Sequence, residues 1–556
     1  MRLLPGLGVL RAYQRSWLRP DVLAGLTVGA MLIPQSMGYA ALAGLAPQYG
    51  FYAVIGALVV YAFFGTSRHL GVGPEPGTAL LAASGVAAIA GGDGARYVTL
   101  MAALAMVVAA VCLVAWALRL GYLASMLSKP VLVGYITGVG LTLVSSQLSG
   151  LTAVPIDADD FFPRLWQFAT RLDEVNGPTA TLGVAALAVM LLLKWRLPSA
   201  PSALIGVVLA TAVAAMLSLE QHGVAMVGSI PAGLPTPSLP DVSLHDLALL
   251  LPVAAGIALV GFTDNVLTAR AIASRKGYRI EPNQELLALG LTNLTSGLSQ
   301  GFPLSSSASR TAVPASLGSR TQLVSLVAAA FVVASLLFAR PLLAEIPRTA
   351  LAAVILMAAV TIIDVSGFVS LWRVSRAECV LAVVATTGVV VLGVLYGIVI
   401  AVALSIAVAL ANIARPHDAV LGDMPDVDGW VDVNEYPAAL TSPGLVVFRF
   451  DAPLFFVNAE RFSDRVQQVL ADNPGDEEWL VMDCEGIGAL DASAVEMLGE
   501  LIGHLQEAGV AVIAVARANE RVLDRLRRAG LLQPTGQVHT YPTINGAVRA
   551  FHNRES

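Results

Sequence analysis

QGFPLSSSASRTAVP, residues 300–314, is the stretch that decides the fold, because it is polar yet lies between long apolar runs. A helix needs about 20 residues to cross a bilayer, so this stretch cannot cross alone. A polar segment at membrane depth persists only where protein buries it or where it lines a water-filled cavity. We therefore expect a half-helix that opens at residues 304–309, with its N-terminal amides facing an anion and Arg310 adding a full charge. An ordinary solvated loop is the alternative.

The composition is that of a polytopic membrane protein. Of 556 residues, 56% are hydrophobic and only 13% are charged, and the mean hydropathy is +0.73. Soluble domains average about 25% charged residues. The three cysteines offer neither a disulfide framework nor a metal cluster. Residues 1–20 carry four arginines and no signal-peptide pattern, so we expect them to form a cytoplasmic segment before the first span.

Fourteen apolar segments follow, and several are too short or too rich in glycine to be simple spans. They lie at residues 22–43, 48–65, 75–91, 98–118, 130–150, 178–194, 203–219, 247–269, 284–300, 305–317, 321–340, 345–363, 378–395 and 396–413. Residues 71–84, GVGPEPGTALLAAS, and residues 301–314 are Gly/Pro- or Ser-rich interruptions seven spans apart. A matching pair of interrupted segments indicates an inverted-repeat transporter with its binding site at that pair.

Loop charges predict the orientation. With a cytoplasmic N-terminus, thirteen cations fall on the cytoplasmic side: Arg68, Arg119, Lys129, Lys194, Arg196, Arg270, Arg275, Lys276, Arg279, Arg320, Arg373, Arg376 and Arg415. The other side receives five arginines beside the acids Asp157, Asp159, Asp160, Asp173 and Glu174. This is the positive-inside pattern, and an even number of spans returns the C-terminus to the cytoplasm.

The composition changes after Arg415. Residues 416–443 are rich in Pro, Gly and Asp and are expected to be a linker between a membrane domain at 21–415 and a small α/β domain at 444–556. In the latter, apolar runs at 445–450, 479–483 and 510–516 suit buried strands. Residues 459–471, 492–507 and 519–529 have helical periodicity between them.

Long motifs resemble those of the SulP family of anion transporters (sulfate permeases, solute carrier family twenty-six), and the closest likeness is to actinobacterial members. They are DVLAGLTVGAMLIPQSMGYAALAGL at 21–45, YGFYAVIGALVVYAFFGTSRHLGVGPEPG at 49–77, SKPVLVGYITGVGL at 128–141, LSSSASRTAV at 304–313, RPHDAVLG at 415–422 and FRFDAPLFFVNAERF at 448–462. The resemblance implies fourteen helices in a 7+7 inverted repeat, a core bundle moving against a gate bundle, a homodimer, and a C-terminal cytoplasmic STAS domain.

The resemblance also implies an anion site between the N-termini of the third and tenth spans. Gln35 and Tyr39 in the first span would contact the substrate, as would Ser309 and Arg310 in the tenth. Gln35 and Tyr39 are one helical turn apart and so share a face. The forked donors of Arg310 suit an oxyanion, with a structural ion pair to an acid as the alternative role.

Two carboxylates accompany this site. Asp264 follows an apolar run, occupies the family's cation-coupling position, and is a candidate proton carrier. Hydration near the cytoplasmic end of its helix is the alternative. Glu75 departs from the apolar or small residue that is usual in the family. It either shares charge with Arg310 and takes up a proton when the anion arrives, or it only caps the third span. Thr268, one turn after Asp264, would help to form a sodium site.

Ser493 in the STAS domain matches a serine that is phosphorylated in soluble STAS proteins, but Ala494 replaces the usual glycine. A helix cap formed by Asp491 and Ser493 is therefore favoured over a regulatory site. We find no nucleophile–base pair, Walker motif or metal-ligand cluster in the sequence, so we expect no enzyme activity, no cofactor, no metal and no coupling to ATP.

These patterns predict a secondary active transporter in the inner (cytoplasmic) membrane that takes up a small oxyanion, most simply sulfate, with protons. Sodium-coupled bicarbonate uptake and proton-coupled dicarboxylate uptake are alternatives of the same class. A nucleobase transporter would want an acidic or amide group in place of Arg310. An anion channel and a STAS-based membrane signalling platform are alternatives of other classes. The expected partners are the anion, the coupling cation, the lipid bilayer and a second copy of the chain, and no nucleic acid.

Overall fold

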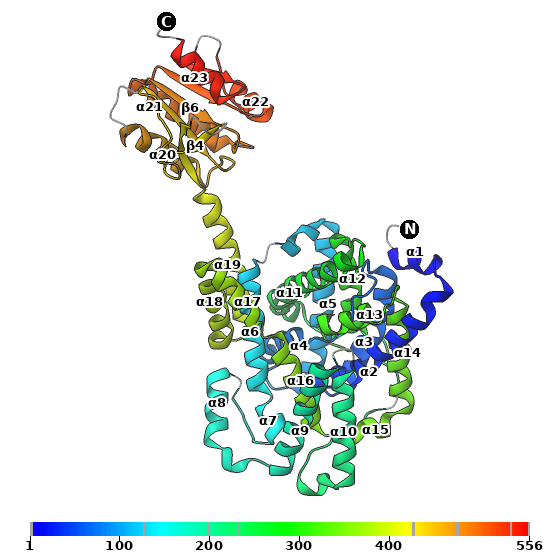
Figure 1. Cartoon of the computed structure of the whole chain (residues 1–556). Coiled ribbons are helices and arrows are strands. Elements are labelled where there is room, and N and C mark those ends of the chain that lie inside the picture. Colours follow the sequence, from blue (N-terminus) through cyan, green and yellow to red (C-terminus); the bar gives the residue numbers. More distant parts are fainter. Residues whose placement is uncertain are drawn as a thin grey trace. The chain divides into compact units, whose positions relative to one another are not determined.

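The computed structural model describes residues 4–125, 128–158, 160–197, 200–231, 233–424, 429–472, 478–533 and 536–553, so Asp159 lies outside the described residues. The chain divides into two compact units, which we call the helical unit (Met1–Ser405) and the α/β unit (Ile406–Ser556). Figure 1 shows that helices dominate the first unit and that a sheet with covering helices makes up the second.

The helical unit consists of two series of helices, each interrupted once by a short strand. The first series is α1 (Pro5–Arg11), α2 (Leu18–Leu42), α3 (Gln48–Phe64), β1 (Val72–Gly73), α4 (Pro76–Ala90), α5 (Gly94–Ala117), α6 (Lys129–Ser146), α7 (Leu148–Thr152), α8 (Phe161–Thr170), α9 (Gly177–Arg196) and α10 (Ser202–Met216). The second series is α11 (Leu244–Lys276), α12 (Pro282–Leu298), β2 (Ser305–Ser306), α13 (Ala308–Ser316), α14 (Leu323–Phe338), α15 (Arg340–Ala344), α16 (Arg348–Ile362), α17 (Val365–Val374), α18 (Arg376–Leu392) and α19 (Val394–Ala414).

Each of the fourteen expected apolar segments coincides with one of these helices, which confirms the expected architecture of seven plus seven spans. The first seven are α2 to α6, α9 and α10, and the second seven are α11 to α14, α16, α18 and α19. Among the described residues, seven helices are long and apolar enough to cross a membrane, while others such as α4 are shorter. The third span of each set of seven, α4 in the first and α13 in the second, follows a short strand, so the two sets share one order of spans.

The spans other than α19 pack into two groups. The core bundle comprises α2 to α5 and α11 to α14, in which α12 packs on α5 and α3, and α14 packs on α2. The gate bundle comprises α6, α9, α10, α16 and α18, in which α18 packs on α6, and α16 packs on α9 and α10. The helix α2 continues through Pro34 to Leu42. Two apolar clusters each contain residues of both bundles, so the core and gate bundles pack against one another.

The α/β unit contains a six-stranded sheet with strand order β4-β3-β5-β6-β7-β8. Its strands are β3 (Asp418–Asp423), β4 (Trp430–Asp432), β5 (Leu445–Phe450), β6 (Trp479–Asp483), β7 (Val512–Ala516) and β8 (Val538–Tyr541). Its helices are α20 (Ala459–Asp472), α21 (Ala492–Glu507), α22 (Glu520–Arg528) and α23 (Ile544–His552). The helices α20, α21 and α22 contribute to one apolar core, and α23 contributes to a second one. Strands β5 to β8 pair in parallel, as the alternation of strand and helix predicts.

The linker expectation for residues 416–443 is wrong for two segments. Strand β3 pairs antiparallel with β5, and β4 pairs with β3, so both belong to the sheet. Strand pairing here overrides a composition typical of a linker. At the start of α21, Asp491 caps the helix by accepting a hydrogen bond from the Ala494 amide at 2.8 Å. Ser493 is exposed on the first turn of that helix, and its phosphorylation stays a prediction.

Candidate functional site

Two helix N-termini meet inside the helical unit. The strands β1 and β2 pair antiparallel, with Val72 opposite Ser306, and α4 and α13 begin within three residues of them. The Ser307 amide also donates to the Gly71 carbonyl at 3.1 Å. A Cβ atom on Gly71 would lie 2.8 Å from Cβ of Arg310, so the backbones can approach this closely only with glycine at that position. The expected meeting of two interrupted segments is therefore present.

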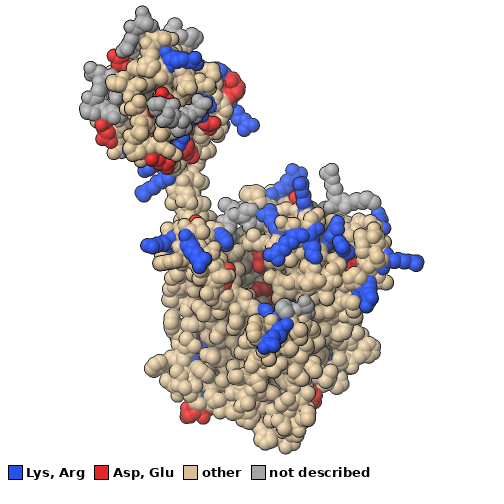
Figure 2. All heavy atoms as spheres, viewed as in Figure 1, with Lys and Arg blue, Asp and Glu red and all other residues tan. Residues whose placement is uncertain are grey.

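A cavity of about 550 Å³ lies in front of these two helix starts, between the core and gate bundles. Figure 2 shows the hollow in this face of the helical unit, with acidic side chains visible inside it. Core residues in its wall include Gln35, Tyr39, Glu75, Thr78, Asp264, Ser305, Ser306, Ser307 and Ser309, and gate residues include Leu132, Tyr135, Lys194, Ser202, Met357 and Thr361. A cavity bounded by both bundles changes shape when one bundle moves against the other.

Arg310 lies fully buried behind this wall and is not itself a wall residue. Its Nη1 donates to Oε1 of Gln35 at 2.9 Å, whereas Nε and Nη2 have no hydrogen-bond partner among the described residues. No carboxylate within the described residues lies within ion-pair distance of the guanidinium. An unpaired buried cation raises the electrostatic potential in its neighbourhood, and here it opposes the negative charges of Glu75 and Asp264 in the wall. Arg310 therefore acts on the cavity through its charge and through Gln35, and direct contact with an anion stays a prediction.

Glu75 is the N-cap of α4. Its Oε2 accepts hydrogen bonds from the Thr78 amide at 2.7 Å and from the Thr78 hydroxyl at 3.1 Å. It makes no ion pair with Arg310, so of the two roles considered from the sequence, the geometry matches the cap. The carboxylate still reaches the cavity wall, where it places negative charge beside the helix N-terminus.

Asp264 is partly buried on α11 and reaches the cavity wall. The Ser306 hydroxyl donates to Oδ2 of Asp264 at 3.2 Å, which links α11 to β2. Thr268, one turn further along α11, is partly buried and is not a wall residue. The structure thus brings Asp264 to the same cavity as Gln35 and Glu75, and it leaves Thr268 outside the wall.

Tyr39 and Ser309 are also in the wall, as the sequence predicts. Tyr39 is 3% exposed and lies one turn after Gln35 on α2. The hydroxyls of Ser307 and Ser309 are 2.9 Å apart at the start of α13. That helix begins at Ala308, after the strand β2, so the half-helix starts later than residue 304. The wall therefore offers several neutral hydroxyl groups and two helix N-termini, which are suitable donors for an oxyanion.

The gate bundle contributes two wall residues that were not predicted from the sequence. The Tyr135 side chain on α6 is 2% exposed, and its hydroxyl has no hydrogen-bond partner among the described residues. Lys194 was counted among the loop cations, but it lies within α9 and in the cavity wall. Tyr135 stands in an apolar run next to Gly134, which is also a typical core pattern. The sequence therefore does not show whether Tyr135 is a core residue or a cavity residue, and only the packing of the gate bundle against the core bundle decides this.

Comparison with known proteins identifies the family. Residues 18–385 match the sulfate permease family, and residues 436–547 match the STAS domain. The chain is 47% identical over 550 residues to "Probable sulfate transporter Rv1739c" of Mycobacterium tuberculosis, covering 99% of this chain and 98% of that protein. It is 32% identical over 559 residues to "Probable sulfate transporter 4.2" of Arabidopsis thaliana, covering 97% and 82%.

The fold has a close match among solved structures. The murine anion transporter Slc26a9 in its inward-facing state superposes with a TM-score of 0.91 at 24% sequence identity, covering 99% of this chain and 94% of that one. This agreement confirms the fourteen-span inverted repeat followed by a STAS domain. Family and fold together therefore place the chain in the sulfate permease family, as an anion transporter with a C-terminal STAS domain.

Proposed function

We propose that this chain takes up sulfate by alternating access and that protons drive the uptake. One observation carries the proposal: a cavity between the core and gate bundles is faced by two helix N-termini, with an unpaired buried arginine directly behind them. Helix N-termini and a guanidinium each favour an anion, and here they act on the same cavity. The names of the relatives in Mycobacterium tuberculosis and Arabidopsis thaliana support sulfate as that anion.

The neutral groups of the wall would orient the anion. Gln35, Tyr39 and Ser309 surround the helix starts and can present amide and hydroxyl donors to sulfate oxygens. Arg310 would supply the charge without contacting the anion in this conformation, because it is buried behind the wall. Binding by dipoles and neutral donors is weak enough to let the anion leave on the other side, which a transporter requires.

Proton coupling is supported by the balance of charges at the cavity. Two carboxylates, Glu75 and Asp264, are in the wall and only one arginine, Arg310, is behind it, so a proton on one carboxylate would reduce the repulsion of the anion. Glu75 is occupied as a helix cap, so Asp264 is the better candidate for a group that takes up a proton when the anion binds. A proton on Asp264 would remove a negative charge from the cavity and leave its hydrogen bond with Ser306 intact. The sodium alternative needs oxygen ligands beside Asp264, and Thr268, which lies outside the wall, is hydrogen-bonded to that carboxylate and would be one of them.

Alternating access would move the core bundle, carrying both helix starts, past the gate bundle. The positive-inside pattern supports a cytoplasmic location for both termini, in the cell's inner membrane. We also propose a homodimer, which chemical cross-linking of membranes followed by intact-mass measurement would test.

The decisive experiment combines binding and flux. Purified protein is titrated with sulfate, bicarbonate, a dicarboxylate and chloride, with and without Arg310→Ala, and proteoliposomes are assayed for uptake under an imposed pH or sodium gradient. We expect sulfate to bind best, Arg310→Ala to abolish binding, and a pH gradient to drive uptake. Sulfate uptake that ignores the pH gradient but follows sodium would refute proton coupling. Preferred binding of another anion would refute the substrate.

A deletion of residues 436–556 distinguishes a transporter from a STAS-based signalling platform, and current measurements distinguish it from an anion channel. A transporter keeps measurable uptake or loses it together with folding, because the cavity lies wholly in the helical unit. A signalling platform would lose its function while the membrane part stays folded, and no uptake would be found in either form. A channel would pass anions without coupling, which current measurements in planar bilayers detect.

A further inference from the structure

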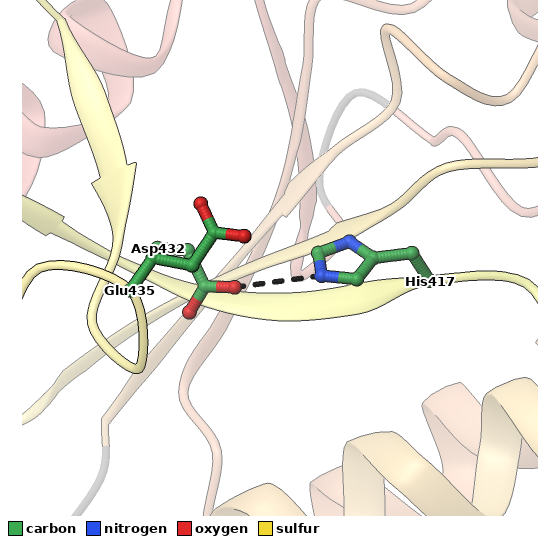
Figure 3. A group of neighbouring side chains, drawn as sticks. All are labelled: His417, Asp432 and Glu435. Atoms are coloured by element: carbon green, nitrogen blue, oxygen red, sulfur yellow. Dashed lines mark ion pairs between the residues drawn. The ribbon is translucent and has the colours of Figure 1, made fainter. Parts of the chain in front are cut away.

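Three potential metal ligands meet in the α/β unit. His417, Asp432 and Glu435 each offer one ligand atom, and these atoms all lie within 4.8 Å of one another. Figure 3 shows the two carboxylates on the same side of the imidazole ring. His417 directly precedes β3, Asp432 ends β4, and Glu435 follows in the next turn. The residues are separated along the chain, and the pairing of β3 with β4 brings them together. For this reason the sequence shows no metal motif.

The separation of the first two ligands leaves room for a metal ion bound to both. His417 Nε2 lies 3.5 Å from Oδ2 of Asp432. A charge-assisted hydrogen bond between such groups would be about 2.7–2.9 Å long. Two ligands of a tetrahedral zinc ion, each bound at about 2.0–2.2 Å, lie roughly 3.3–3.5 Å apart. The observed distance is therefore compatible with two ligands of one metal ion as well as with an ion pair.

The other nitrogen of the ring is held by an acid outside the three ligands. His417 Nδ1 lies 3.1 Å from Oδ2 of Asp451. An ionised carboxylate can only accept, so Nδ1 carries the hydrogen and the lone pair of a neutral ring is on Nε2. The other oxygen of Asp451 forms an ion pair with Arg449 at 3.2 Å, which holds the carboxylate in place. A carboxylate that orients the ring from behind is the usual support of a metal-binding histidine.

The two acids are also placed for coordination. Asp432 is only 6% exposed, and its Oδ1 accepts from the Asn434 amide at 2.8 Å, which leaves Oδ2 directed at His417. The amides of Glu435 and Tyr436 both donate to the Asp432 carbonyl, and this turn returns the Glu435 side chain to the ring. Glu435 is exposed, so an ion can enter from solvent and keep a water ligand.

We propose that His417, Asp432 and Glu435 form a binding site for a divalent transition-metal ion, with zinc as the best fit. One imidazole nitrogen and two carboxylate oxygens suit zinc, and water completes the tetrahedron. The ion joins the segment before β3 to the turn after β4 and so stabilises the edge of the sheet. Because a metal that binds only the folded form stabilises it, zinc raises the unfolding temperature of the α/β unit.

The test uses the purified full-length protein in detergent, with any affinity tag removed and metals stripped by a chelator. Zinc is titrated calorimetrically, and metal retained after desalting is measured by mass spectrometry. We expect one zinc ion per chain, a raised unfolding temperature, and reversal of both by chelator. His417→Gln and Glu435→Gln should abolish the effect, and Asp451→Asn should weaken binding roughly tenfold or more, as supporting residues of metal sites do.

His539→Gln is the matched control, because His539 is an exposed histidine on β8 of the same sheet. The control variant should bind zinc as the unchanged protein does. Glu435→Gln removes a ligand at an exposed position, so this variant should fold even though a substitution at the buried Asp432 could prevent folding. Equal zinc binding by the unchanged protein and by His417→Gln would overturn the proposal. It would equally fail if the folded protein bound no zinc, because His417 would then only link Asp432 to Asp451.

Discussion

Replacing Gln35 with glutamate tests whether the charge behind the cavity attracts the anion. Gln35 accepts a hydrogen bond from Arg310 at 2.9 Å and is part of the cavity wall. Glutamate has nearly the same shape, so Gln35→Glu keeps the contact and turns it into a buried ion pair. The guanidinium charge is then neutralised at the point where it acts on the cavity. We expect the variant to fold and to bind sulfate poorly.

The size of the effect follows from Coulomb's law. One added negative charge about 5 Å from the anion, at an effective dielectric constant of about 20, costs roughly 3 kcal/mol per unit charge on the anion. That is on the order of a hundredfold loss of affinity for a monovalent anion, and the loss in free energy is about double for sulfate. The readouts are calorimetric sulfate binding by the purified variant and sulfate uptake into proteoliposomes.

Gln35→Met is the matched neutral control. It leaves Nη1 of Arg310 unpaired, which should reduce stability by about 1–3 kcal/mol, and it keeps the charge in place. Like Gln35→Glu it also removes the amide donor that Gln35 would present to sulfate, so the difference in affinity between the two variants reports the added charge. Size-exclusion chromatography and thermal unfolding show that both variants are folded. If Gln35→Glu bound sulfate as tightly as the unchanged protein, or if Gln35→Met lost as much affinity, the electrostatic reasoning would be wrong.

Three further predictions concern the proton, the gate and the α/β unit. Asp264→Asn can no longer ionise, so sulfate should still bind while uptake stops responding to a pH gradient; a preserved response in proteoliposomes would contradict this. Tyr135→Phe deletes a hydroxyl that has no hydrogen-bond partner among the described residues, so the stability of the protein should be unchanged. If this hydroxyl donates to the bound sulfate, calorimetry should show an affinity about 2- to 10-fold lower, as expected for one lost hydrogen bond, and equal affinity would exclude a contact between the Tyr135 hydroxyl and sulfate. Burial, assisted by the charge of Asp483, raises the pKa of the Cys484 thiol from 9.0 to about 12. The folded protein therefore keeps a proton that the unfolded chain loses above pH 9.0, so stability from this group should fall as pH rises from 9.0 towards 12, and maleimide at pH 8 should label Cys484 only after unfolding.

Much of the architecture could be predicted from local patterns. All fourteen apolar segments correspond to helices, and the strands at 445–450 and 479–483 have the predicted bounds. These elements depend on continuous apolar runs, whose signal is contained in neighbouring residues. The segment at 416–443 was misjudged because β3 and β4 acquire their strand character from pairing with β5, which lies beyond them in the sequence.

Several residues of the cavity wall were predictable, and their arrangement was less so. Gln35, Tyr39 and Asp264 are in the cavity wall as expected, because a polar side chain within an apolar helix faces a cavity or a partner. Arg310 was expected at the anion, and the structure buries it behind the wall with Gln35 in front. The gate residues Tyr135 and Lys194 were not predicted as wall residues, because a tyrosine in an apolar run and a lysine near a helix end are both common in membrane helices without any functional role.

The sequence by itself determined that this chain spans the membrane many times, that two interrupted segments recur seven spans apart, and that an α/β domain follows. Those conclusions need only local hydrophobicity and spacing, because the bilayer requires each span to be apolar and to satisfy its own backbone. Tertiary structure alone decided that Arg310 is fully buried behind the cavity, that Glu75 caps a helix, and that His417, Asp432 and Glu435 converge. Each of these depends on residues distant in the sequence or on the choice between competing partners, and packing makes that choice.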